Sequence, residues 1–540
     1  MPIRIFPFLC LPAVLVGAAP HAAMDALLGR YFKADLPGAV VLVQKGGKVV
    51  FRKAYGLASL ESKTPMQPDQ VFRIASVTKT FTAAAVLRLA EEGKVELSTS
   101  IHNYLPDLPE AWGPVTVAHL LSNTSGIPNY TDDPAWWPRQ GEDLSPAILL
   151  ETYVRPKPLE FEPGTDWHYS NSGYLLLGQL IEAVSGQDYE SALRTRFFGP
   201  FKLERTRYGW DAPPIPGLAV GYLADGRPAP RVDKGQLFST AGLVSTVDDL
   251  GTWLRALTTG QAVAPASFRK MAESWKFPDG RLAGYGFGLY LRPSQGHRLA
   301  GHGGQILGYT GFVEADLDAD VQVVLLTNRF PPVVAPEYLT RRLLALAIGR
   351  ALAEPKPVAL DPGKLARLTG QYKGRRLFRV SFAEGRLWVL KGPDRAELVP
   401  LSDTEFQEKD SDRKFRFTLS RGKSIGLRLQ VLGAPATPML LRIGEEMEPA
   451  VVQLDPAQLD ACAGIYEPAP GVRVRYRRDG LRFFCDDPDE GPIELVATGP
   501  DRFQVKGSRI SVEFHRNPEG SVTEVVTFLD ERRVAARRVE

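Results

Sequence analysis

The first part of the chain shows strand-like and helix-like patterns of hydrophobic residues in alternation. The stretch GAVVLVQKGGKVVFRKAYG contains two apolar runs around Gly46–Gly47, which predicts a β-hairpin. Two further strands are predicted on either side of the polar turn Asp316–Asp320, followed by a closing helix at Glu337–Ala353. Because strands stand at both ends of this region with helices between them, we predict an α+β domain whose sheet joins the two ends. The helices predicted between the strands lie at Thr78–Glu92, Val117–Leu121, Ala147–Val154 and Tyr174–Val184.

After the sequence EPKPVAL the pattern changes to short strands and turns, and it repeats. The segment LDPGKLARLTGQY at 360–372 returns as LDPAQLDACAGIY at 454–466, and similar strand-like phrases follow each copy. One small all-β unit present twice explains both observations, so we predict two closed, lipocalin-like β-barrels. The expected domain bounds are 24–354, 355–452 and 453–540, after a signal peptide at 1–23.

The chain begins MPIRIFPFLCLPAVLVGAAPHAA, with one early arginine, an apolar run and a small-residue end. This is the layout of a secretory signal peptide, and the run is short for a membrane span. Cleavage between Ala18 and Ala23 would leave a periplasmic or secreted protein with no stable membrane span. Its two remaining cysteines, Cys462 and Cys485, could then form a disulfide or stay as buried thiols.

Charge and composition exclude several kinds of partner. The net charge is +3 over 540 residues, which gives no reason to expect nucleic-acid binding. The cysteines and histidines do not show zinc spacing, so we expect no metal and no cofactor. Nothing in the sequence fixes an oligomeric state.

The stretch FRIASVTKTFTAAAVLRLAEEGKVEL places Ser76 and Lys79 at the start of the first predicted helix. Ser76 suits the N-cap of a helix, but a cap leaves Lys79 unexplained. Residues three apart share a helix face, and a partly dehydrated lysine can accept a serine proton. The local pattern therefore fits a cap and a nucleophile about equally. Ser-x-x-Lys also occurs three more times, at Ser267–Lys270, Ser411–Lys414 and Ser420–Lys423.

Two further motifs occur once each, Tyr169-Ser170-Asn171 and His302-Gly303-Gly304. Each alone has an ordinary structural explanation, a core tyrosine before a helix and a tight turn at a strand edge. Together with Ser76 and Lys79, they resemble the three motifs of the penicillin-recognising serine hydrolases, which include serine β-lactamases, DD-peptidases and related esterases and aminopeptidases. The resemblance covers about Met24–Ala353 and includes the phrases VAHLLSNTSGIP, EPGTDWHYSNSGYLLLG and GHGGQILGYTGF. Asn123 departs from it, because most relatives have a histidine there.

The resemblance implies a β-lactamase/transpeptidase-like fold, with an antiparallel sheet flanked by helices, and a role for each motif residue. Ser76 would be the acylated nucleophile and Lys79 its partner. Tyr169 would be the general base or proton relay, which near neutral pH requires a cation such as Lys79 to lower its pKa. Asn171 would hold Lys79 and the substrate carbonyl. The oxyanion hole would consist of the backbone N–H groups of Ser76 and Gln305, which follows His302, Gly303 and Gly304.

A rival serine motif, Gly-x-Ser-x-Gly, is present at Gly422–Gly426. A nucleophile elbow needs a strand before it and a helix after it, whereas both flanks here are strand-like. We therefore expect a hairpin turn.

The third motif and the two barrels indicate which hydrolase activity of this family to expect. β-Lactamases of this type usually carry lysine where this chain has His302, and a neutral or titrating histidine is a weaker anchor for a carboxylate. This favours a peptidase, amidase or esterase acting on a small peptide, amide or ester. His-x-Gly followed by two barrels resembles the bacterial D-aminopeptidases, which remove D-residues from the free N-terminus of peptides. The alternatives are a promiscuous carboxylesterase with weak or no β-lactamase activity and a non-catalytic binding homologue.

The segment Cys485–Pro492 packs four carboxylates between two strand patterns. It fits a solvated hairpin turn. The D-aminopeptidase resemblance implies instead a loop of the last barrel that enters the catalytic cleft and binds the substrate's ammonium group. The acidic residues of this possible gating loop are Asp486, Asp487, Asp489 and Glu490.

Overall fold

A computed structural model of the chain divides into two compact units, Met1–Ala353 and Glu354–Glu540. The described residues are 20–209, 215–373, 377–391, 394–420, 423–431, 440–444, 452–469, 472–487, 491–505, 510–529 and 532–540.

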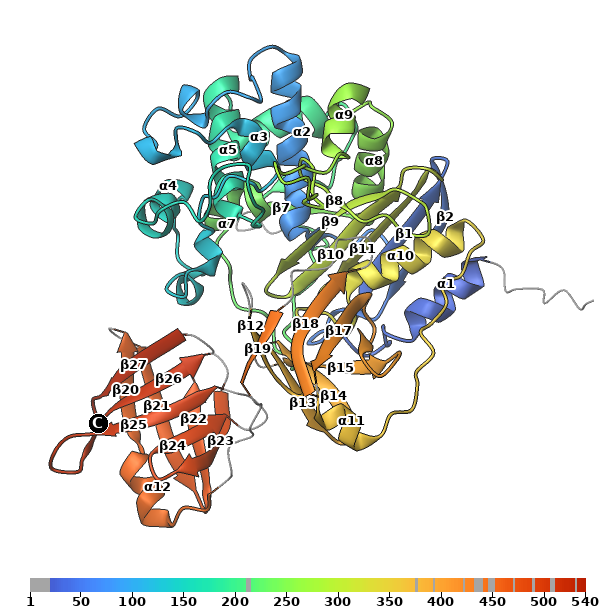
Figure 1. Cartoon of the computed structure of the whole chain (residues 1–540). Helices are drawn as coiled ribbons and strands as arrows, with labels where there is room; N and C mark the ends of the chain where they lie inside the picture. The colour runs from blue at the N-terminus through green and yellow to red at the C-terminus, as the bar shows by residue number, and fades with distance from the viewer. Residues whose placement is uncertain are drawn as a thin grey trace, which may run out of the picture. The chain divides into compact units, whose positions relative to one another are not determined.

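The first unit is built on a six-stranded antiparallel sheet (Figure 1) with the strand order β2-β1-β11-β10-β9-β8. The predicted hairpin is confirmed, since β1 and β2 pair around Gly46–Gly47. β1 also pairs with β11 along its whole length, from Ala39 opposite Thr327 to Lys45 opposite Val321. The two ends of the unit therefore share the sheet, as predicted. The strands are β1 (Ala39–Lys45), β2 (Lys48–Tyr55), β8 (Tyr290–Leu291), β9 (Leu299–Ile306), β10 (Tyr309–Asp316) and β11 (Val321–Thr327).

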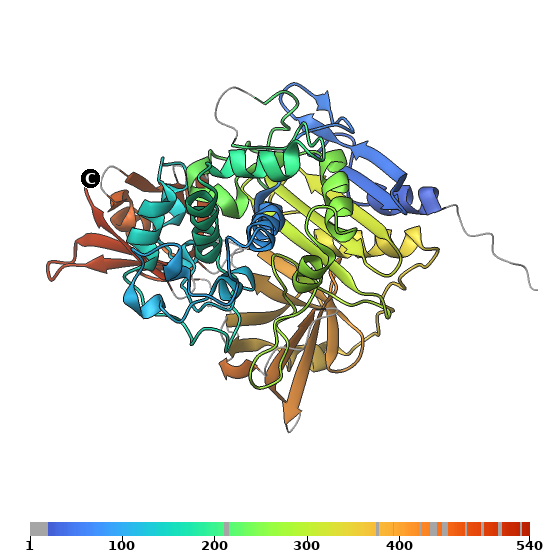
Figure 2. The same cartoon turned by 90° about the horizontal axis from the view of Figure 1, so that it is seen from above.

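The central strand β1 is buried on both faces, which explains its continuous apolar sequence. Val41 and Val43 pack with the helices α1 (Pro20–Gly29) and α10 (Pro336–Ala347). Val40 and Leu42 face the opposite way, into the large core of the helical region. Because successive side chains of a strand alternate in direction, one apolar run supplies both cores. Figures 1 and 2 show the helices on the two sides of the sheet.

The helices between the strands follow the predicted order. α2, α3 and α5 begin and end within three residues of their predicted bounds, while the segment from Ala147 continues past α4 as a π-helical turn at Leu150–Val154. The closing helix ends at Ala347, earlier than predicted, because Gly349 adopts a left-handed φ of +75° and the chain turns back. The helices are α2 (Thr78–Glu91), α3 (Val117–Leu121), α4 (Pro146–Leu149), α5 (Asn171–Ser185), α6 (Tyr189–Leu193), α7 (Lys234–Ala241), α8 (Val247–Thr258) and α9 (Pro265–Met271). Short strands lie at β3 (Leu57–Ser59), β4 (Thr64–Pro65), β5 (Phe72–Arg73), β6 (Arg207–Tyr208) and β7 (Leu243–Ser245).

The second unit contains two closed antiparallel barrels, each of eight strands that pair in chain order. The predicted fold class, an α+β domain followed by two all-β barrels, is therefore confirmed. The first barrel consists of β12 (Gly370–Lys373), β13 (Leu377–Ala383), β14 (Arg386–Lys391), β15 (Asp394–Pro400), β16 (Glu405–Glu408), β17 (Arg413–Ser420), β18 (Lys423–Val431) and β19 (Leu440–Gly444). The second consists of β20 (Gly464–Ala469), β21 (Val472–Asp479), β22 (Arg482–Asp487), β23 (Gly491–Gly499), β24 (Arg502–Val505), β25 (Ser511–Arg516), β26 (Val522–Leu529) and β27 (Arg532–Arg538).

The sequence repeat has a structural counterpart at the start of each barrel. Asp361 and Asp455 cap the short helices α11 (Pro362–Ala366) and α12 (Pro456–Cys462). A fully buried tyrosine follows each helix and donates its hydroxyl back to a carbonyl four residues earlier: Tyr372 to Leu368 at 2.6 Å and Tyr466 to Cys462 at 3.0 Å. The repeated residues thus close one end of each barrel core.

Two expectations about the barrels are settled by local geometry. Cys462 and Cys485 are both buried and are not joined by a disulfide. Ser424 is buried in β18 and pairs with Leu419 of β17, so it lies in a strand pair and no helix follows it. Gly422 lies outside the described residues.

The predicted signal peptide falls mostly outside the described residues, which begin at Pro20. Met24, Leu27 and Leu28 of α1 are buried. Within the described part of the chain, none of the helices combines the length and the apolar character needed to cross a bilayer.

Candidate active site

Ser76 lies in a short 3₁₀ turn, Ala75–Val77, immediately before α2. Ala75 has a φ of +47°, a left-handed conformation that costs energy for a residue with a Cβ and is often found at functional sites. The N-cap position of α2 is occupied by Val77, and it has no side-chain cap. The hydroxyl of Ser76 instead contacts Nζ of Lys79 at 3.2 Å. Ser76 is therefore not the cap of this helix.

Lys79 is completely buried and is the second residue of α2. Its Nζ atom has three oxygen neighbours: Ser76 Oγ at 3.2 Å, Asn171 Oδ1 at 2.7 Å and the backbone carbonyl of Thr240 at 3.0 Å. Burial lowers the pKa of Lys79 well below its usual range. This site thus favours a neutral amine beside the serine.

Tyr169 lies beside Lys79, with its ring centroid 4.8 Å from Nζ. Burial raises the pKa of Tyr169 well above its ordinary value, and a hydrogen bond with Ser76 lowers it only in part. This direction is opposite to the expectation that a cationic Lys79 lowers the pKa of this phenol. The physical reason is that burial acts on both groups and favours the neutral form of each.

Asn171 is the first residue of α5 and is held from three directions. Its Oδ1 accepts from Lys79, its Nδ2 donates to Thr131 Oγ1 at 3.1 Å, and its backbone N–H donates to Asn129 Oδ1 at 3.0 Å. An amide nitrogen has two hydrogens, so one remains for a substrate carbonyl.

The third motif lies in β9 and approaches the Ser76 turn closely. A Cβ added at Gly304 would lie 2.1 Å from the carbonyl oxygen of Ile74 and 3.2 Å from the backbone nitrogen of Ser76. Only glycine permits this approach, since both contacts are with backbone atoms. Gln305, the next residue, continues β9 opposite Thr310. The two predicted oxyanion donors thus belong to segments that touch each other.

His302 is 1% exposed and hydrogen-bonded through both ring nitrogens. Its Nδ1 lies 2.6 Å from the carbonyl oxygen of Gly303, and its Nε2 lies 3.0 Å from the hydroxyl of Tyr285. Burial lowers the pKa of His302 to about 3. Of the two states considered from the sequence, neutral or titrating, the structure therefore favours the neutral one. The ring reaches the other motifs through Tyr169, whose ring centroid is 6.1 Å away.

Several residues of the site could not be found from the sequence. Asn123, the departure from the family pattern, adopts a left-handed φ of +59°, a conformation that asparagine tolerates better than most residues. It accepts a hydrogen bond from the backbone of Ser170 at 3.1 Å and so holds the segment between Tyr169 and Asn171. Thr131, Thr240 and Tyr285 contribute from distant parts of the chain, and no local pattern marks them.

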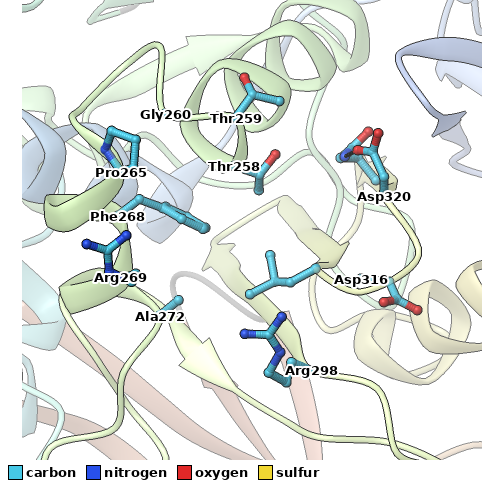
Figure 3. Close-up of a pocket in the computed structure, with 12 residues that line it drawn as sticks. Thr258, Thr259, Gly260, Pro265, Phe268, Arg269, Ala272, Arg298, Asp316 and Asp320 are labelled. Atoms are coloured by element: carbon cyan, nitrogen blue, oxygen red, sulfur yellow. Dashed lines mark hydrogen bonds between the residues drawn. The ribbon is translucent and has the colours of Figure 1, made fainter.

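A separate cavity of about 430 Å³ opens at the other end of β9 and β10 (Figure 3). Asp316, which pairs with Leu299 at the start of β9, lines it, and none of the predicted site residues does. Three of its charged residues form ion pairs: Asp320 with Arg255, Arg298 with Asp318, and Asp316 with His297. This cavity therefore does not belong to the catalytic constellation.

The acidic segment of the second barrel is described only in part. Asp486 accepts from Arg477 Nε at 2.7 Å across the β21–β22 pair, and Asp487 ends β22. Asp489 and Glu490 lie outside the described residues. The ion pair of Asp486 fits the hairpin interpretation, while entry of this loop into the catalytic cleft remains a prediction.

The comparisons with known proteins identify the family of the chain. The family model described as Beta-lactamase matches residues 22–347. The chain therefore belongs to the beta-lactamase family, and it is a serine hydrolase of that family.

The individual proteins described next are 27–28% identical to this chain over the aligned residues. Over 409 residues the chain is 27% identical to penicillin-binding protein 4* of Bacillus subtilis (strain 168), covering 70% of this chain and 89% of the relative. It is 28% identical over 367 residues to a D-aminopeptidase of Gluconobacter oxydans (strain 621H), covering 65% of this chain and 66%, just under two thirds, of that protein. The crystal structure of D-amino acid amidase from Ochrobactrum anthropi SV3 complexed with L-phenylalanine amide superposes with a TM-score of 0.51 and 28% identity, covering 61% of this chain and 98% of the amidase.

Proposed function

We propose that this protein forms an acyl-enzyme on Ser76 and cleaves the amide bond of short substrates that carry a D-amino acid, as a D-aminopeptidase or a D-amino acid amidase would. The observation that carries the proposal is the environment of Lys79, which is fully buried 3.2 Å from the Ser76 hydroxyl. A neutral amine has two hydrogens and one lone pair. It can donate to Asn171 and to the carbonyl of Thr240, its two shorter contacts, and turn the lone pair toward the serine proton.

In the proposed acylation step, Ser76 Oγ bonds to the substrate carbonyl carbon while its proton moves to Lys79. The backbone N–H groups of Ser76 and Gln305 hold the resulting oxyanion. The carbon–nitrogen bond then breaks, and the leaving nitrogen takes a proton from the Tyr169 hydroxyl. Tyr169 regains its proton from Lys79. A phenol whose pKa is raised suits this donor role better than the role of a base.

The substrate class rests on His302 and on the relatives. A buried neutral imidazole supplies no positive charge for the carboxylate of a penicillin or of a C-terminal D-alanine. Two of the proteins reported above are named for D-amino acid substrates. We also propose that the protein is exported, on the pattern of its first 23 residues.

The test is a substrate panel of D-alanyl p-nitroanilide, L-alanyl p-nitroanilide, p-nitrophenyl acetate and a chromogenic cephalosporin. We expect kcat/KM to be highest for the D-alanyl amide among the amides and lowest for the cephalosporin. A fluorophosphonate probe should label Ser76 alone, and Ser76→Ala should lower kcat at least about a thousandfold. Hydrolysis of the ester without either amide would replace the amidase proposal with a carboxylesterase. Labelling at another serine would overturn the mechanism.

A further inference from the structure

Tyr285 is a buried tyrosine that belongs to none of the three motifs. It lies in the loop before β8, where its backbone carbonyl accepts from Trp275 at 3.0 Å. Its ring packs edge-on against Tyr290 at 4.8 Å and against His302 at 5.9 Å between centroids. The side chain is fully buried, so its hydroxyl must find its partners within the protein.

The hydrogen bonds of His302 determine which ring nitrogen carries the proton. The neighbour of Nδ1 is the carbonyl oxygen of Gly303 at 2.6 Å, and a carbonyl oxygen can only accept. Nδ1 must therefore carry a hydrogen. The neutral imidazole has one N–H, which leaves Nε2 with a lone pair facing the Tyr285 hydroxyl at 3.0 Å.

Tyr285 has one proton and two neighbours that could take it, because its hydroxyl also has a hydrogen bond with Tyr174. The hydroxyl of Tyr174 donates its own proton to the carbonyl oxygen of Leu121 at 2.9 Å. Among the hydrogen bonds of the described residues, Nε2 of His302 has no donor other than Tyr285. If Tyr285 donated to Tyr174 instead, the buried Nε2 of His302 would have no donor. That loss costs more free energy than leaving the oxygen of Tyr174, which already bonds to Leu121, without a further donor.

We infer that Tyr285 is a positioning residue: it donates to Nε2 of His302, fixes the Nδ1–H tautomer, and through the Nδ1–H bond to Gly303 sets the peptide plane that leads into Gly304 and Gln305. These two hydrogen bonds, called the relay below, connect Tyr285 through His302 to β9, the strand that touches the Ser76 turn. Neither side chain needs to touch the substrate. In this arrangement His302 orients the oxyanion strand and does not act as a cation or as a general base.

The consequence for catalysis follows from where the relay ends. The carbonyl of Gly303 directly precedes Gly304, whose backbone lies against Ile74 and Ser76, so a rotation of this peptide would displace β9 relative to the Ser76 turn. An oxyanion donor that is misplaced loses most of its effect in the transition state, while ground-state binding is affected less. Loss of the Tyr285 hydroxyl should therefore lower kcat much more than it changes KM.

The first test needs no variant. Long-range ¹H–¹⁵N correlation spectra of protein labelled at histidine nitrogen should show His302 as the Nδ1–H tautomer, with no change between pH 5 and pH 8. The signal is assigned by its loss in His302→Gln. Free histidine prefers the Nε2–H tautomer, so an Nε2–H form, or titration near pH 6.5, would overturn the inference.

The second test compares two buried tyrosines. Tyr285→Phe should change the ¹⁵N shift of His302 Nε2, which loses its hydrogen-bond donor, and lower kcat roughly tenfold with little change in KM. Tyr372→Phe is the matched control, because Tyr372 is equally buried and its hydroxyl donates to the carbonyl of Leu368 at 2.6 Å in the first barrel, outside the unit that holds the three motifs. The control should lose stability only. Equal kinetic losses in both variants, or an unchanged His302 spectrum in Tyr285→Phe, would refute the positioning role.

The kinetic part rests on the proposed function, whereas the spectroscopic part does not. If the protein hydrolyses none of the substrates, the tautomer of His302 and its response to Tyr285→Phe still decide the inference. If hydrolysis is found but His302 carries its proton on Nε2, the proposed function stands and the relay fails.

Discussion

Gly304 offers the sharpest single test of how the site is assembled. In Gly304→Ala the new Cβ would meet the carbonyl oxygen of Ile74 at 2.1 Å. Ordinary contacts of this kind require more than about 3 Å, so β9 and the Ser76 turn must separate by about 1 Å. Both segments are held by backbone hydrogen bonds, β9 by its pairing with β10 and Ile74 by its N–H bond to Leu243 at 3.1 Å. The strain therefore cannot be relieved by rotating a side chain.

The expected magnitude follows from what this separation does to the oxyanion hole. The two proposed donors, the N–H groups of Ser76 and Gln305, lie on the two segments that are forced apart. Removal of one oxyanion donor typically costs about 10²–10³ in kcat, and a misplacement of about 1 Å can cost about a hundredfold. We expect Gly304→Ala to lose about a hundredfold in kcat on the best substrate, with a smaller change in KM.

The control variant changes the neighbouring residue, Gly303. In Gly303→Ala the new Cβ would meet the ring of Phe312 at 2.9 Å, which is a contact with a side chain and not with the backbone of the Ser76 turn. Stopped-flow acylation rates and melting temperatures of both variants separate chemistry from folding. We expect Gly303→Ala to keep kcat within a few fold. Acylation by Gly304→Ala at near the wild-type rate would refute the idea that this close approach forms the oxyanion hole, and so would equal losses in both variants.

Three further predictions concern the charged and titrating groups. Tyr169→Phe should slow acylation by amides by about 10²-fold or more and by p-nitrophenyl acetate much less, because p-nitrophenolate leaves without a proton; equal slowing of both would make Tyr169 the base instead. Because the pKa of His302 is about 3 in the folded protein and 6.5 for a histidine exposed to water, its stabilising contribution is complete above about pH 6.5 and is lost as the pH falls toward 3. At pH 5 that loss is about 2 kcal/mol, so the fall in stability between pH 7 and pH 5, followed by urea denaturation, should be smaller in His302→Gln than in wild type. Replacing Asp486, Asp487, Asp489 and Glu490 with asparagine and glutamine should raise KM for substrates with a free amine and leave N-acetylated substrates unaffected, and no selective effect would leave the segment as an ordinary hairpin.

The sequence by itself determined the parts of this protein that depend on local periodicity. The apolar run of β1 and its glycine turn predicted the hairpin, and the alanine-rich stretch after Thr78 predicted α2 to within one residue. The repeat around Tyr372 and Tyr466, together with the short strand-like segments after each copy, predicted two barrels. In the structure each copy carries an aspartate cap and a buried tyrosine. The three motifs, read together, indicated the family.

The protonation states and the exact contacts of the site were decided only by the tertiary structure. A pKa depends on how completely a group is removed from water, and the residues that bury Lys79, Tyr169 and His302 come from segments far apart in the chain. The resemblance therefore implied that a cationic Lys79 lowers the pKa of Tyr169, whereas burial raises it. In the same way, Tyr285 beside His302 and Ile74 beside Gly304 are contacts between distant segments, which no pattern of neighbouring residues can encode.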